Sequence, residues 1–179
     1  MAVLIEAISV VIKRSVINEK YPRGWEGFVA DAPNETLCAD GELARVGFMA
    51  PDDVESFVNH LKQYDFIYQQ DGIAKELVVV DQRQGCFTKC EWLTFGFCNF
   101  DRDEKKRVAA CIAVDDTDSP LLTPDGWEYE GSLSHTYGYV PIEHTDKSLK
   151  FLRHEDGLDV YFNELTGKEA YIGRTGETV

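Results

Sequence analysis

PDDVESFVNHLKQY, residues 51–64, is the segment with the clearest secondary-structure signal. Pro51 suits the first position of a helix, and Asp52 and Asp53 complement the positive end of the helix dipole. The apolar residues recur every three or four positions, which places them on one helical face: Val54, Phe57, Val58, Leu61 and Tyr64. The segment therefore predicts a helix that packs one face on a sheet.

The rest of the first half predicts short strands and short helices. EAISVVIK (6–13) alternates in the β manner and predicts one strand within the apolar start of the chain. Helices are predicted at 16–21, with Ser15 as the N-cap, and at 25–31. Further strands are predicted at 43–49, 65–69 and 73–81.

The second half shows no long helical period. Residues 90–97 and 108–114 predict a hairpin across a charged connection, and the almost wholly apolar second strand is expected to be central. WEYEG (127–131) predicts the start of another strand, and the last thirty residues predict a three-stranded meander. This order predicts an α+β fold with a mainly antiparallel sheet, helices concentrated in the N-terminal half and a C-terminal half that is nearly all β.

The length of 179 residues suits a single globular domain, 1–179. Within it, an α+β part (1–81) and a β-rich part (82–179) would share one core. The apolar start lacks a basic leader region and contains Glu6, so it predicts a strand of a cytoplasmic protein and not a signal peptide. Five cysteines, an odd number, fit a reducing compartment.

The charge balance restricts the classes of partner. The chain has 18 basic and 32 acidic residues and a formal net charge of −14. Such a field repels phosphate backbones and anionic lipids, so neither nucleic acid nor a membrane is predicted as a partner. A basic protein partner would be attracted, although the same charge also serves solubility alone. The oligomeric state is not indicated.

Metal and cofactor motifs are weak. On a strand, Cys86 and Cys90 would lie roughly 13 Å apart, so they and Cys98 are interpreted as small apolar residues in or beside the core. Asp115, Asp116 and Asp118 fit either a divalent-cation site or a turn whose side chains bond their own backbone, and the turn is favoured. Nucleotide-binding loops and spaced histidine pairs are absent from the sequence. No metal and no cofactor are predicted.

WEYEGSLSHTYGYVP (127–141) is the stretch best suited to recognition. Its aromatic residues offer rigid contact area, and its serines and glycines adapt around them. The alternative is that the rings alternate on strands and pack against a sheet. The candidate binding residues are Trp127, Glu128, Tyr129, Glu130, His135, Tyr137 and Tyr139.

These observations predict an acidic cytoplasmic binding protein, an inhibitor or immunity-type protein for a basic partner, in preference to an enzyme. The alternative is a small-ligand-binding protein or an enzyme with a pocket on a curved antiparallel sheet, where His135, Tyr137, Glu128 and residues 115–118 would supply polar groups. A third hypothesis is a structural subunit that associates through an apolar patch.

Overall fold

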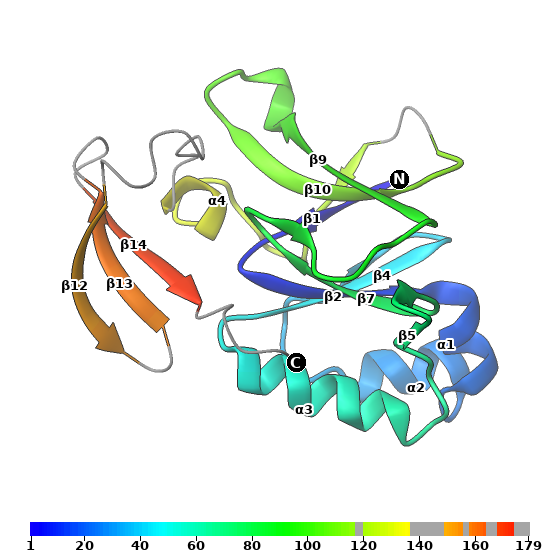
Figure 1. Cartoon of the computed structure of the whole chain (residues 1–179). Helices are drawn as coiled ribbons and strands as arrows, with labels where there is room; N and C mark the ends of the chain where they lie inside the picture. The colour runs from blue at the N-terminus through cyan, green and yellow to red at the C-terminus, as the bar shows by residue number, and fades with distance from the viewer. Residues whose placement is uncertain (117–119, 137–148, 156–157, 164–167, 174–179) are drawn as a thin grey trace.

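The computed structural model describes residues 1–116, 120–136, 149–155, 158–163 and 168–173. It confirms the α+β class: the longer helices lie in the first half, and mostly antiparallel sheets make up the rest. Figure 1 shows the three longer helices on one side of the larger sheet and a second sheet on its other side. The core therefore has three layers.

The larger sheet has five antiparallel strands. Its centre is β2, in which Val10 pairs with Val46 on one side and Val79 on the other. The strand order is β3 (Cys38–Ala39), β4 (Leu43–Phe48), β2 (Ile8–Lys13), β7 (Leu77–Asp81) and β8 (Gly85–Cys86).

Three helices cover one face of this sheet. Val10 and Ile12 of β2 belong to the buried cluster on that face, together with Phe57 and Leu61. The helix predicted at 51–64 is confirmed, and its buried residues are four of the five predicted: Val54, Phe57, Val58 and Leu61. The helices are α1 (Arg14–Lys20), α2 (Gly24–Ala30) and α3 (Pro51–Lys62).

The second sheet packs on the opposite face. Val11 and Val78, which alternate with the helix-facing residues, share a cluster with Val3, Ile5 and Cys111. The predicted hairpin is confirmed, and β10 is flanked on both sides, as expected for a central strand. The strand order is β11 (Leu121–Leu122), β1 (Ala2–Ile5), β10 (Arg107–Ala113) and β9 (Leu93–Asn99).

The predicted strand at 6–13 differs from the structure at its start. β2 begins only at Ile8, and residues 2–5 form β1 of the other sheet. Glu6 and Ala7 make the joint, where Ala7 adopts a positive φ of 47°. This conformation is unfavourable for alanine, and it redirects the chain from one layer to the next.

Three further predictions are wrong. α1 begins at Arg14, and among the described residues no side chain caps it, so Ser15 is not its N-cap. The strand predicted at 73–81 is two strands: β6 (Ile73–Ala74) pairs with β5 (Gln69–Gln70), and β7 belongs to the larger sheet. Residues 127–131 form an irregular segment that ends in a turn and not a strand, and they lead into α4 (Leu133–Thr136).

The predicted C-terminal meander is confirmed. It forms a separate sheet, which lies beyond α4 from the two packed sheets (Figure 1). Its strands are β12 (Leu149–Glu155), β13 (Leu158–Asn163) and β14 (Lys168–Gly173). Before β10, the chain also forms a short 3-10 turn, η1 (Phe100–Arg102). No helix in the described part of the chain is long and apolar enough to cross a membrane.

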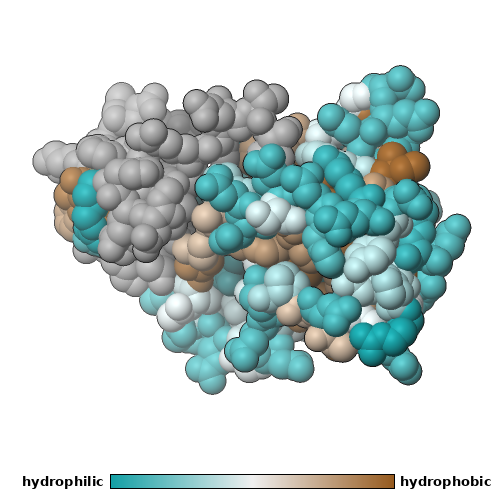
Figure 2. All heavy atoms as spheres, turned by 90° about the horizontal axis from the view of Figure 1, so that it is seen from below, coloured by the Kyte–Doolittle hydropathy of each residue, from teal (hydrophilic) through white to brown (hydrophobic). Residues whose placement is uncertain are grey.

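Figure 2 shows that hydrophilic residues cover most of the described surface on the face seen from below. Apolar residues are visible mainly near the centre of that face and in small separate spots. The large apolar side chains that are exposed come from separate parts of the chain: Met1, Val29, Met49, Ile67, Phe87, Val114, Leu152 and Phe162.

Candidate functional site

A pocket of about 510 Å³ lies between the end of β4, the preceding loop 34–36, the start of α3 and residues 124–127. Trp127, a candidate binding residue, is part of its wall. The pocket is called the Trp127 pocket below. Its position follows from the fold, because the joint between β1 and β2 places Glu6 and Ala7 in its lining.

The floor of the Trp127 pocket contains Arg45, whose side chain is fully buried. Its Nε donates to Ser9 Oγ at 2.9 Å, Nη1 to the carbonyl of Thr36 at 3.0 Å, and Nη2 to the carbonyl of Glu6 at 3.0 Å. Burial lowers the pKa of Arg45 from its ordinary value. These three acceptors partly replace the water that the guanidinium loses on burial.

The loop 34–36 is fastened to β4 beside this guanidinium. Thr36 Oγ1 accepts a hydrogen bond from the backbone N–H of Gly47 at 2.7 Å, and Asn34 Nδ2 donates to the Gly47 carbonyl at 2.8 Å. Asn34 Oδ1 accepts from the backbone N–H of Thr36 at 3.0 Å. The loop therefore has a fixed position at the side of the pocket.

Glu6 connects the floor to the wall. Its Oε1 accepts from the backbone N–H and the hydroxyl of Ser134, at 2.8 and 2.7 Å, and its Oε2 accepts from Trp127 Nε1 at 3.1 Å. Glu6 is also close enough to Arg45 to act on its charge. The carboxylate of Glu6 therefore favours the charged form of Arg45, and it holds the indole of Trp127 in place.

The mouth of the pocket is acidic. Among the described residues that line the pocket, Arg45 alone is basic. Three carboxylates at the mouth are exposed, and with Glu6 the lining has four acidic residues: Glu6, Glu35, Asp53 and Asp125. The surplus of carboxylates gives the entrance a negative potential, which favours a positively charged group there.

The residues predicted for recognition are only partly brought together. Trp127 is half-buried in the pocket wall, and Tyr129 is buried. Glu128 is exposed, and Glu130 is exposed and paired with Lys106 at 2.8 Å. His135 lies against Tyr129, with ring centroids 5.4 Å apart. Tyr137 and Tyr139 lie outside the described residues.

The rings of this segment form an aromatic cluster on the second sheet. The Phe100 ring is 5.1 Å from Trp127 and 6.3 Å from Tyr129, between centroids. The cluster packs against Leu4 and Val108. In this segment, therefore, the aromatic rings fasten the chain to the protein, while Glu128 and Glu130 face the solvent.

The predicted placement of the cysteines is partly confirmed. Cys86 and Cys90 pack against the cluster between the two sheets, but Cys98 is exposed and does not belong to the core. Burial raises the pKa of Cys86 to about 11. Within the residues that the structure describes, no group of three His, Cys, Asp or Glu side chains is arranged to hold a metal ion.

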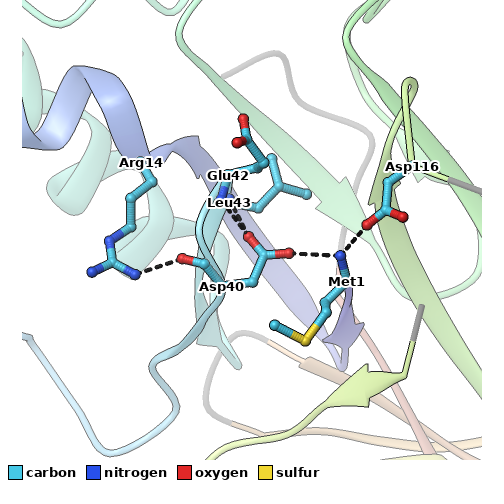
Figure 3. Close-up of polar contacts among 6 residues, drawn as sticks. All are labelled: Met1, Arg14, Asp40, Glu42, Leu43 and Asp116. Carbon is cyan, nitrogen blue, oxygen red and sulfur yellow. Dashed lines mark hydrogen bonds and ion pairs between the residues drawn. The ribbon is translucent and has the colours of Figure 1, made fainter.

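The acidic residues at 115–118 have separate positions. Asp115 is exposed, and Asp118 lies outside the described residues. Asp116 binds the α-ammonium group of Met1, which also contacts Asp40 Oδ2 at 3.0 Å (Figure 3). The carboxylate of Asp116, and after it that of Asp40, raises the pKa of this ammonium group against the opposing effect of desolvation.

Asp40 is held in place for this contact. It is buried, and its Oδ1 accepts from the backbone N–H groups of Glu42 and Leu43, both at 2.6 Å. Its backbone carbonyl accepts a hydrogen bond from Arg14 Nη1. Because Oδ1 is occupied by the two backbone N–H groups, Oδ2 is the oxygen that faces the ammonium group (Figure 3). Two carboxylates, which follow strands β3 and β10 of different sheets, thus bind one ammonium group.

The sequence interpretation did not single out Arg45, Gly47, Asn34 or Thr36 as parts of a site. The available signal was the presence of charged residues within apolar runs, Glu6 in VLIEAI and Arg45 in LARVGF. Such charges are seldom buried unless they are paired. The contact between these two distant segments, from Arg45 Nη2 to the carbonyl of Glu6, became visible only in the fold.

No protein-family model, no curated protein and no solved structure matches this chain.

Proposed function

We propose that this chain is an acidic binding protein that occupies a basic protein partner, as an inhibitor or immunity-type protein does. The observation that supports the proposal best is the mouth of the Trp127 pocket, where Glu35, Asp53 and Asp125 surround an opening beside a fixed indole. A concave acidic surface with an aromatic wall is complementary to a protruding basic side chain.

Long-range charge supports the same partner. The net charge of −14 accelerates encounter with a positively charged protein and disfavours nucleic acid. Glu128 extends the acidic surface along the segment that contains Trp127, while Glu130 is paired with Lys106. All five cysteines are free thiols, which supports the proposed cytoplasmic location.

A second candidate is a small-ligand-binding protein or an enzyme. The observation in its favour is the volume of the Trp127 pocket, about 510 Å³, which is typical of ligand sites. Glu6 and Arg45 would then be the polar groups of the floor. Their hydrogen bonds to Ser134, Ser9 and the backbone serve the protein itself, which makes this candidate the weaker one.

Site-specific photo-crosslinking tests the protein-binding proposal. A benzophenone amino acid is placed at Glu128, near the pocket, and in a matched variant at Asp71, an exposed acidic residue of the turn between β5 and β6. We expect a protein of positive net charge to be captured from position 128 and not from position 71. Capture should weaken as the salt concentration rises.

Two results would count against the proposal. One is that neither position captures a basic protein from the producing cell. The other is that position 128 captures only neutral or acidic proteins, with a yield that does not depend on salt.

A further inference from the structure

We infer that the Trp127 pocket binds one arginine side chain of the basic partner. The inference rests on the proposed function and adds to it the residue type that the partner inserts. It is carried by three features of the pocket: its volume of about 510 Å³, its surplus of carboxylates and its tryptophan wall.

The charges of the pocket favour a cation over an anion or an uncharged group. Arg45 at the floor is already bonded to three acceptors, and the nearby Glu6 favours its charged form. The carboxylates of Glu35, Asp53 and Asp125 have no basic counterpart in the described lining. An entering cation would supply the charge that balances them.

The tryptophan wall of the pocket favours an arginine side chain over a lysine side chain as the ligand. A guanidinium group is planar, so it can lie against an indole while its N–H groups reach carboxylates at the rim of the pocket. The protein contains such a stack elsewhere: Arg14 Cζ lies 3.7 Å from the ring centroid of Trp25. In comparison, Lys13 Nζ is 5.0 Å from the ring centroid of Trp92.

The indole of Trp127 is held in a fixed orientation. Its Nε1 donates to Glu6, and its ring contacts Phe100, so the indole is already oriented before a ligand arrives. A fixed side chain loses little conformational entropy on binding. The pocket can therefore act as a preformed socket for the anchoring residue of a larger interface.

N-acetyl-arginine amide is the probe for the test, and N-acetyl-citrulline amide, which has nearly the same shape without the charge, is its control. Both are titrated into the full chain labelled with ¹⁵N. The indole N–H signal of Trp127 is assigned by its loss in Trp127→Phe. We expect this signal to shift and saturate with the arginine probe and to stay in place with the citrulline probe.

Two charge-matched triple variants locate the binding. The first, Glu35→Gln with Asp53→Asn and Asp125→Asn, neutralises the mouth of the pocket. The second neutralises three exposed acidic residues outside it, with the substitutions Glu19→Gln, Asp71→Asn and Glu104→Gln. The affinity for the arginine probe should fall roughly ten-fold in the first variant and stay within about two-fold in the second.

Three outcomes would overturn the inference: no saturable shift of the Trp127 signal, equal shifts with both probes, or equal loss of affinity in both triple variants. The proposed function fails separately. Salt-sensitive capture of a basic protein at position 128, together with no shift of Trp127 by the arginine probe, would leave the binding protein in place and reject the arginine socket.

Discussion

The guanidinium group of Arg45 occupies the space that a side chain at position 47 would need. A Cβ atom placed on Gly47 would lie 2.7 Å from Arg45 Cζ and closer still to Nη2. Residues 45 and 47 point to the same side of β4, so the absence of a side chain at Gly47 is what allows Arg45 to reach Ser9 and Glu6.

Substitution of Gly47 by alanine should therefore displace Arg45. We expect Gly47→Ala to lower the free energy of unfolding by about 2–3 kcal/mol, since the added methyl group displaces the buried guanidinium from its hydrogen bonds to Ser9, Thr36 and Glu6. Urea denaturation measures the loss. Gly41→Ala is the matched control, because a Cβ at Gly41 meets no atom within 4 Å. Equal stability of the two variants would contradict the described packing.

Glu6 should determine the position of Trp127. The carboxylate of Glu6 accepts three hydrogen bonds, two from Ser134 and one from Trp127. In Glu6→Gln, the NH2 group of the new amide is a donor, and it faces N–H or O–H groups that are donors as well. We expect a loss of about 2–3 kcal/mol in the free energy of unfolding, a red shift of tryptophan emission and faster hydrogen exchange at the Ser134 amide.

The matched control for this change is Glu128→Gln. Glu128 is exposed and lies next to Trp127 in the sequence, so it loses the same charge without a buried partner. Its stability should stay within about 0.5 kcal/mol of the parent protein. Unchanged exchange at Ser134 in Glu6→Gln would show that the bonds of Glu6 do not hold this segment.

The ammonium group of Met1 should make stability depend on alkaline pH. Its pKa is raised in the fold by Asp116 and Asp40, so its stabilising effect is complete below the ordinary value of 8.0 and is lost as the pH rises through the raised pKa. We expect the melting temperature to fall above pH 8. Selective acetylation of the α-amino group should lower it already at pH 7 and flatten this part of the profile.

The thiols contribute to the same alkaline loss, which is why the acetylated chain is needed as a reference. The folded state raises the pKa of Cys86 from 9.0 to about 11, so unfolding is favoured where the exposed thiol ionises and the folded thiol does not. The difference between the parent and acetylated chains at each pH isolates the ammonium group. A constant difference from pH 7 to pH 10 would refute its assigned role.

Burial should also set the order in which the cysteines react. At pH 8, we expect iodoacetamide to modify exposed Cys98 first, and Cys86 and Cys90 more slowly. Cys38 and Cys111 are buried and should react only with the rate of unfolding. Mass spectrometry of timed samples gives the order. Early modification of Cys111 would contradict the packing between the two sheets.

The sequence predicted those elements whose pattern is repeated over many residues. The helix at 51–64 shows its buried face through five apolar positions, and the hairpin shows its central strand through an almost wholly apolar run. In both cases the local sequence pattern agrees with the burial seen in the fold, so the pattern alone is enough to locate the element.

The errors arise where tertiary contacts override a local pattern. Alternating rings at 127–129 imitate a strand, but Trp127 and Tyr129 are fixed in an irregular segment by Glu6 and Phe100. The joint at Ala7 has no glycine or proline to mark it. The Trp127 pocket was missed for the same reason, because Glu6 and Arg45 are distant in sequence and meet only through the pairing of β2 with β4.

The pairing of β1 with β10 restricts the order in which the chain can fold during its synthesis. Val3 is synthesised about one hundred residues before its partner Cys111. During that interval the growing polypeptide carries an apolar AVLI segment whose hydrogen-bonding edges are not yet satisfied by β10. A nascent chain of this design is exposed to mispairing until the second half arrives, so translation speed and chaperone access should govern its yield.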